Sequence, residues 1–241
     1  MRDLSRKLSS GHPNWPGDPA FQLERAAQIS KGDSVNTANI RTGTHSGTHV
    51  DAPFHYDETG LTLEQIPLEV YVGRCRVIHA IGFSSVPASI LEPYPTLPAR
   101  VLIFTGQPAH WNHFPEDFVA LEPDLIRALG LKGVKLVGTD SPSVDPLTSK
   151  TLEAHHAFKD AGMFILEGLN LEGVPEGEYE LICLPLPLVG ASEAPPSAVG
   201  TGVEDASGVS LPVVVTVQPA ATAPPRTSAE RIEETCRPVM K

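Results

Sequence analysis

The sequence contains few cysteines and few aromatic residues. Its three cysteines, Cys75, Cys183 and Cys236, lie far apart and form no Cys-x-x-Cys pair. This spacing excludes a disulfide framework and favours a reducing, cytoplasmic setting. Aromatic residues make up only 6% of the chain, so the tryptophan in the loop around residue 15 is more informative than it would be in an average protein.

Basic residues are also scarce, and the formal net charge at pH 7 is −11. Binding to nucleic acid or to an anionic membrane surface requires a basic surface, so we expect neither partner. The chain has no run of about 18 apolar residues, the length that a membrane span requires. Residues 1–10 lack the apolar core of a signal peptide. We therefore expect a cytoplasmic protein.

Hydrophobic residues make up 41% of the chain, which is enough for a core of ordinary size. Strand-like runs alternate with short helical segments, a pattern typical of α/β or α+β proteins, and we predict one compact α/β domain over residues 1–190. We expect strands at residues 2–8, 21–25, 35–40, 74–81, 100–105, 134–137, 163–168 and 179–184, and helices at residues 122–130 and 148–160.

The composition changes after Gly190. Residues 191–227 are rich in Pro, Ala, Ser, Gly and Val and contain few bulky side chains. Such a segment buries little surface, so we predict an irregular, poorly ordered extension over residues 191–241 that takes no part in the functional site. The composition of this segment is compatible with a genuine extension and equally with a frame-shifted C-terminus.

Residues 44–55 contain three of the nine histidines, at positions 45, 49 and 55, together with Asp51. Imidazoles and carboxylates are the usual nitrogen and oxygen ligands of zinc and similar divalent ions. The concentration of these groups in one short segment has no simple structural explanation. We therefore predict that this segment binds a metal ion, with three or four ligands drawn from His45, His49, Asp51 and His55.

This segment is unlike the helical His-Glu-x-x-His zinc motif, because Ser46 occupies the position of the glutamate. Gly47 and Pro53 also interrupt any helix here. In an extended chain, His49 and Asp51 would point to one face. A bend at Pro53 would then bring the next histidine round to the same site.

A second set of ligands lies further along the chain. His155 and Glu167 are expected at a helix and at a strand end, and His156 is the alternative ligand if the helix register differs. Glu167 ends an apolar run, where a buried carboxylate needs a partner such as a metal ion. A two-metal site is therefore plausible, and two such ions can generate a nucleophilic hydroxide near neutral pH.

Trp15 lies in a loop rich in proline and glycine at residues 9–19. The ring can pack over the end of the core, or it can form the aromatic wall of a pocket. Composition alone leaves both interpretations open.

Residues 45–55 read His-x-Gly-Thr-His-x-Asp-x-Pro-x-His, which resembles the signature of the cyclase-like metal hydrolases. Within that family the chain looks like the bacterial arylformamidase, or kynurenine formamidase, branch. The resemblance covers residues 2–190. It also rests on Trp15-Pro16-Gly17-Asp18 and on the segments 138–145, 155–156, 165–169 and 184–190.

The resemblance implies a compact, barrel-like (swivelling β/β/α) domain, a homodimer, and two Zn²⁺ ions per subunit, with Mn²⁺ as an alternative. It implies that Asp51 bridges the two ions, that Glu167 contacts both, and that Trp15 lines an aryl pocket. The remaining implied roles are metal ligands at His45, His49 and His155 and an acid–base catalyst at His55.

The implied reaction is hydrolysis of N-formyl-L-kynurenine, an aryl formamide, to L-kynurenine and formate in tryptophan degradation. No Gly-x-Ser-x-Gly nucleophile elbow is present in the sequence. Two alternatives remain open. The first is a related hydrolase of a cyclic amide such as isatin. The second is a metal-binding protein without turnover, in which His55 is only a fourth ligand.

Overall fold

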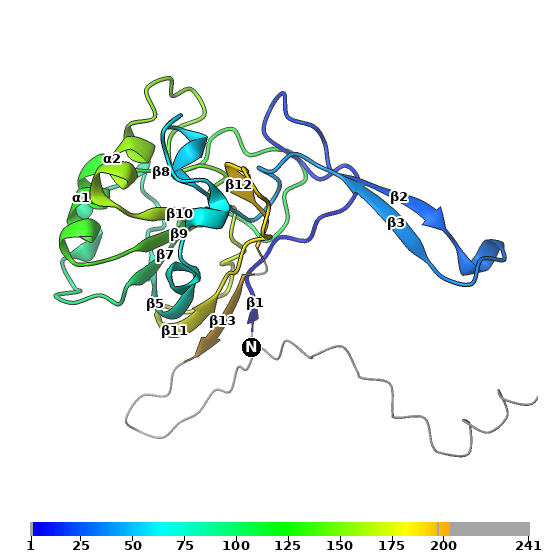
Figure 1. Ribbon diagram of the computed structural model, residues 1–241. Coiled ribbons are helices and arrows are strands. Elements are labelled where there is room, and N and C mark those ends of the chain that lie inside the picture. The colour runs from blue at the N-terminus through cyan, green and yellow to red at the C-terminus, as the bar shows by residue number, and fades with distance from the viewer. Residues whose placement is uncertain (1, 197, 203–241) are drawn as a thin grey trace, which may run out of the picture.

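The computed structural model of the protein describes residues 2–196 and 198–202 (Figure 1). Its strands and helices follow the predicted alternation closely. The strands are β1 (Arg2–Asp3), β2 (Gln22–Ala27), β3 (Thr37–Arg41), β4 (His49–Asp51), β5 (Val72–His79), β6 (Ser85–Val86), β7 (Arg100–Phe104), β8 (Ala120–Leu121), β9 (Leu136–Thr139), β10 (Phe164–Glu167), β11 (Gly177–Ile182), β12 (Glu193–Ala194) and β13 (Val199–Gly202). The α-helices are α1 (Pro123–Leu131) and α2 (Glu153–Ala161).

Nine strands form one mixed sheet in the order β1-β13-β11-β5-β7-β9-β10-β4-β12. Its centre, β5-β7-β9-β10, is parallel, and the flanking pairs are antiparallel. Central parallel strands are buried on both faces and read as continuous apolar runs. In β7, Val101 and Ile103 enter one core cluster while Leu102 and Phe104 enter the other.

Both α-helices cover one face of the sheet (Figure 1). Helix α1 starts with a proline, where the missing N–H costs nothing, and buries Leu125, Ile126 and Leu129. Helix α2 buries Ala157 and Phe158 and ends at a left-handed glycine, as a helix C-terminus commonly does. These side chains form one core cluster with β7, β9 and β10.

The second core cluster lies on the other face and contains residues from both edges of the sheet. Leu4 follows β1, Ala194 ends β12, and both join the same cluster as Leu102 from the centre. A sheet whose two ends share one core must curl around it. The single α/β domain with a barrel-like sheet is thus confirmed.

The folded domain extends past the boundary predicted at Gly190. Strand β12 pairs with β4, and β13 lies between β1 and β11. The small side chains of Ala194 and Ala198 are fully buried, so low bulk here reflects a tight fit and not disorder. Residues 191–196 and 198–202 are therefore part of the domain, contrary to the composition-based prediction. The prediction for residues 203–241 lies outside the described residues.

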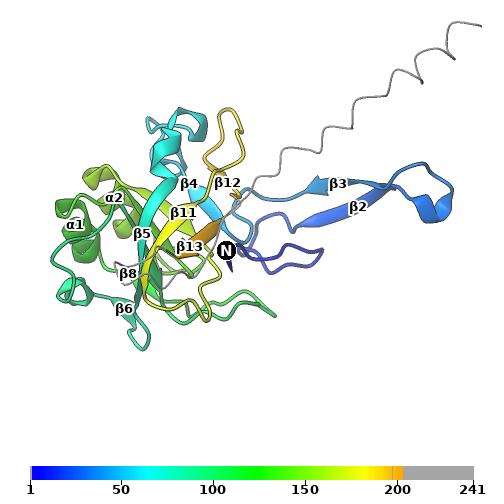
Figure 2. The same ribbon diagram turned by 90° about the horizontal axis from the view of Figure 1, so that it is seen from below.

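Strands β2 and β3 form a two-stranded hairpin that projects from the body of the protein (Figures 1 and 2). Apart from the half-buried Ala27, the residues of both strands are exposed. No helix in the described part of the chain is long and apolar enough to cross a bilayer.

The antiparallel pairing of β4 with β10 places Glu167 directly opposite His49. The chain then turns sharply at Gly168, whose φ is +63°. A Cβ atom on this residue would lie 2.1 Å from the carbonyl oxygen of Gly47, in the histidine segment. Glycine is therefore required for β10 to approach that segment so closely.

We predict that Gly168→Ala lowers the free energy of unfolding by about 3 kcal/mol, roughly 1 for the left-handed backbone and 2 for overpacking. Gly162 is a matched control, because its φ is +61° but no atom lies within 4 Å of the added Cβ. Gly162→Ala should cost only about 1 kcal/mol. Urea denaturation of both variants measures the difference, and equal losses would contradict the argument from close approach.

Candidate metal centre

Two neighbouring strands and one helix bring the two predicted ligand sets together. Strand β4 provides His49 and Asp51, and β10 ends at Glu167 on the same face. Helix α2 provides His155 from its first turn. The Nε2 atom of His49 lies 3.2 Å from Glu167, and that of His155 lies 3.8 Å from Asp51.

The remaining two histidines of the segment flank β4. His45 precedes the strand, and its Nδ1 atom lies 2.8 Å from Nε2 of His49. His55 follows it in the single helical turn Pro53–His55, and its Nδ1 lies 3.2 Å from Nε2 of His45. The extended backbone at residues 49–51 and the bend at Pro53 are as predicted.

These residues include groups whose ligand atoms lie within 4.8 Å of one another. One group is His45, His49, Asp51 and Glu167, and another is Asp51, His55 and His155. Asp51 belongs to both. The alternative residue His156 is exposed and belongs to neither, so the helix register selects His155.

Asp51 shows most clearly that the cluster fits a cation. Its side chain is buried, and neither carboxylate oxygen accepts a hydrogen bond from any of the residues that the structure describes. A buried carboxylate without donors is strongly disfavoured unless a positive charge compensates it. The surrounding imidazole nitrogens and carboxylate oxygens are a donor set that zinc and manganese accept. The cluster can thus hold a metal ion.

The carboxylates also control the protonation of the histidines. Burial alone would lower the pKa of His49, but Asp51 and Glu167 outweigh it and raise that pKa to about 9. Burial also opposes the charged form of Asp51, yet the neighbouring imidazoles, His45 and His49 foremost, hold its pKa well below the usual range. Without a metal, protons on the histidines therefore balance the carboxylates.

Asp145 holds His155 in place. Its carboxylate accepts hydrogen bonds from the backbone N–H groups of Ala154 and His155 and lies 2.7 Å from Nδ1 of the imidazole. Nε2 then faces Asp51 and Glu167. Burial opposes the charged imidazole, but Asp145 and Asp51 raise the pKa of His155 to about 10. Asp145 lies in the segment 138–145 that supports the family resemblance, but its sequence context alone predicted no role for it.

Glu193 is a member of the cluster that sequence reasoning missed. It lies opposite Asp51 in the pairing of β12 with β4 and is 4% exposed. One carboxylate oxygen is 3.0 Å from Nε2 of His45 and 2.6 Å from Nδ1 of His55. The other accepts a hydrogen bond from the hydroxyl of Thr44. The only sequence signal was a lone acidic residue in the small-residue stretch 191–198.

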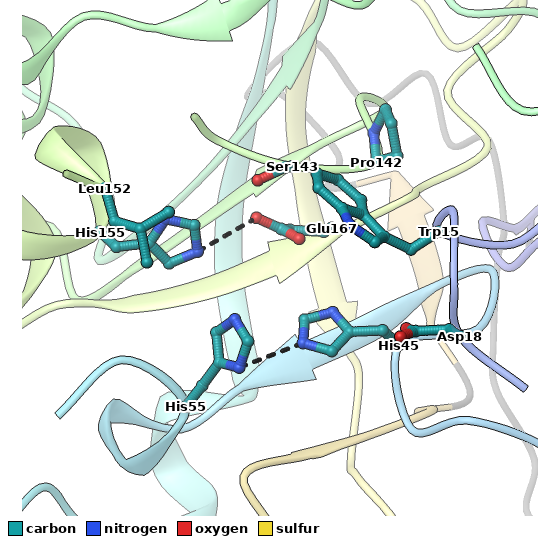
Figure 3. A pocket seen from close by; sticks show the side chains of 9 residues that line it. All are labelled: Trp15, Asp18, His45, His55, Pro142, Ser143, Leu152, His155 and Glu167. Carbon is teal, nitrogen blue, oxygen red and sulfur yellow. Dashed lines mark hydrogen bonds and ion pairs between the residues drawn. The ribbon is translucent and has the colours of Figure 1, made fainter. Parts of the chain in front are cut away.

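A pocket of about 250 Å³ opens beside the cluster (Figure 3). Its walls include Trp15 and Leu152, and its polar residues include Asp18 and Ser143. The ring of Trp15 also packs edge-on against Phe114, with centroids 5.5 Å apart. The ring thus lines the pocket and also contacts a neighbouring aromatic side chain. The remaining lining residues are Pro142 and the cluster members His45, His55, His155 and Glu167.

The model of the Cyclase family, described as "Putative cyclase", matches residues 2–146. The chain belongs to this family. The matched residues of this Cyclase member include the segment from His45 to His55, whereas Glu167 and Glu193 lie beyond them.

Solved structures agree with this assignment. A "potential metal-dependent hydrolase with cyclase activity" is 29% identical, with a TM-score of 0.71 over 83% of this chain and 96% of that one. A "predicted metal-dependent hydrolase" from Bacillus stearothermophilus is 28% identical, with a TM-score of 0.70 and the same two coverages. Isatin hydrolase A from Labrenzia aggregata is 21% identical, with a TM-score of 0.68 over 84% of this chain and 93% of that one, and shares the fold.

We predict that Asp51→Asn abolishes tight binding of divalent metal, because both ligand groups that contain Asp51 lose their shared charge. Asp124→Asn is the matched control, since Asp124 is an exposed carboxylate paired with Arg127 on helix α1. Metal content after dialysis, measured by inductively coupled plasma mass spectrometry, compares the variants. Full metal content in Asp51→Asn would contradict the assignment.

We also predict that metal binding releases protons. The pKa values of about 9 for His49 and 10 for His155 lie above 7, so both imidazoles are protonated at pH 7 in the metal-free protein. Metal ligands must be deprotonated, so binding should release about two protons at pH 7, and affinity should rise with pH up to about 10, the pKa of His155. Calorimetry in buffers of different ionisation enthalpy measures this release; its absence would show that these histidines are not ligands.

Proposed function

We propose that this protein is an arylformamidase that hydrolyses N-formyl-L-kynurenine to L-kynurenine and formate. It would use two Zn²⁺ ions per subunit, with Mn²⁺ as an alternative. The observation that carries the proposal is the position of Trp15. This aromatic wall shares one pocket with His55 and with the metal-ligand candidates His45, His155 and Glu167 (Figure 3).

The candidate ligands can be assigned to two ions. His45 and His49 would hold the first ion and His155 the second, with Asp51 and Glu167 contributing to both. A bound divalent cation supplies Lewis acidity, which polarises a carbonyl oxygen and makes a water molecule more acidic. The chain's part is to fix the ligands, which it does through the register of β4 with β10 and through the contact of Asp145 with His155.

His55 would move the proton in this reaction. Its side chain borders the pocket and contacts the cluster without being fully buried. Hydrolysis forms a bond between the water oxygen and the formyl carbon and breaks the bond from that carbon to the aryl nitrogen. The imidazole accepts a proton from the water and returns it to the departing nitrogen, so that the amine leaves neutral.

Substrate selection would rest on the walls of the pocket. Trp15 and Leu152 present apolar surface for an aryl ring, and the rim offers Asp18 and Ser143 to polar substituents. Such pockets bind mainly through apolar walls with a few oriented polar groups. An aromatic amide is the substrate class that fits this lining best.

A cyclic amide such as isatin is the alternative substrate. It would use the same cluster, and the fold shared with isatin hydrolase A supports it.

A metal-binding protein without turnover would need His55 as a ligand in place of a catalyst. The homodimer and the cytoplasmic location stay predictions.

The test is a direct assay of both substrates with the metal-loaded protein. We expect release of kynurenine and formate from N-formylkynurenine at a kcat/KM at least tenfold above that for ring opening of isatin. Preferential ring opening would favour the alternative, and the absence of both activities would contradict hydrolysis.

His55→Asn separates the catalytic and ligand roles. Loss of an acid–base group should lower kcat by about 10²–10⁴-fold while the metal content stays that of the wild type. Loss of metal in this variant would instead show that His55 is a ligand.

A further inference from the structure

We infer that Glu193 is a positioning residue: one of its carboxylate oxygens lies against a ring nitrogen of both His55 and His45 and fixes the orientation and the tautomer of each ring. This inference rests on the proposed function for its catalytic consequence. The positions of the protons on the two rings do not depend on that function.

The geometry around Glu193 is a small triangle. One carboxylate oxygen lies 2.6 Å from Nδ1 of His55 and 3.0 Å from Nε2 of His45, and these two nitrogens are 3.2 Å apart. An ionised carboxylate only accepts hydrogen bonds, so both nitrogens must carry a proton to bond to it.

The carboxylate is itself held firmly. Glu193 is 4% exposed, and its second oxygen accepts a hydrogen bond of 2.6 Å from the hydroxyl of Thr44. Its backbone position is fixed by the pairing of β12 with Asp51 on β4.

A proton on Nδ1 of His55 leaves the lone pair of the neutral ring on Nε2. In Figure 3, the ring nitrogen of His55 that faces away from His45 points toward the space bordered by His155 and Glu167. That space is where an acid–base residue must exchange protons with water and substrate. Glu193 thus presents the acceptor nitrogen of His55 to the pocket.

The same oxygen has a second effect, on His45. With the proton on Nε2, the lone pair of a neutral ring lies on Nδ1, the atom 2.8 Å from Nε2 of His49. This is the side on which the ligand group with Asp51 forms. A carboxylate that orients a ligand histidine through its distal nitrogen is a common feature of metal sites. Here one residue would support a ligand and a catalyst together.

Nuclear magnetic resonance of the zinc-loaded protein with ¹⁵N-labelled histidine tests the inference directly. We expect the wild-type spectrum to show His55 protonated on Nδ1 and His45 protonated on Nε2. A proton of neutral His55 on Nε2 in the wild type would overturn the inference, and this result requires no variant. It also does not depend on the substrate, so it remains decisive if N-formylkynurenine is not hydrolysed.

The variants supply the kinetic test. Glu193→Ala should release the tautomer preference of His55 and lower kcat by about 10–100-fold, with KM near the wild-type value. Glu193→Gln should retain more activity, because the amide oxygen still accepts hydrogen bonds. Wild-type kcat in Glu193→Ala would overturn the inference. Loss of metal from Glu193→Gln would also overturn it, because Glu193 would then be a ligand in the group with His45 and His55.

Glu64→Ala is the matched control for a general loosening of this segment. Glu64 is exposed and accepts a hydrogen bond from the backbone N–H of Gly190, just before β12, without contacting the histidines. Its substitution should leave the tautomers and kcat unchanged. Equal losses in Glu64→Ala and Glu193→Ala would reduce Glu193 to a structural role.

Discussion

Asp51 brings a negative charge into the protein where none of the described residues donates a hydrogen bond to it. Imidazoles surround it, with His49 at 3.4 Å and His155 at 3.8 Å. Such a group destabilises the fold unless a cation or protonated neighbours compensate the charge. The raised pKa values of the two histidines show how the metal-free protein compensates. A divalent ion would replace those protons.

The pairing of the strands in the sheet holds this cluster rigidly. Strand β4 has only three residues, but it pairs on both sides, with β10 and with β12. Directly opposite residues share a face, so the two registers place Glu167 beside His49 and Glu193 beside Asp51. Gly168 allows the close approach that this pairing requires. The positions of His49, Asp51, Glu167 and Glu193 are therefore set by the backbone hydrogen bonds between these strands.

Local sequence pattern predicted most of this fold. The continuous apolar run of β7 and the proline and glycine that bound α1 and α2 are local signals, and the structure follows them. The dense cluster at residues 45–55 and the glutamate at the end of β10 were also predicted to share one site, and the structure brings them together in a cluster that could hold a metal ion. Such features depend on residues close in sequence.

Features that depend on long-range pairing could not be predicted from the sequence. Strand β12 has two residues and no periodicity, and it pairs with β4, which lies more than 140 residues earlier in the chain. Its alanine-rich composition resembled a disordered tail, although Ala194 and Ala198 are small because they fit against the core. Glu193 was missed for the same reason. Its role depends on neighbours that only the folded sheet provides.

We propose that the carboxylates of Asp51 and Glu167 contribute to two neighbouring cation sites. Anomalous X-ray scattering at the zinc edge, from crystals grown with zinc, tests it most directly. We expect two anomalous peaks, one beside His45 and His49 and one beside His155. A single peak held by His45, His55 and Glu193, or no peak near Asp51, would exclude two sites that share Asp51.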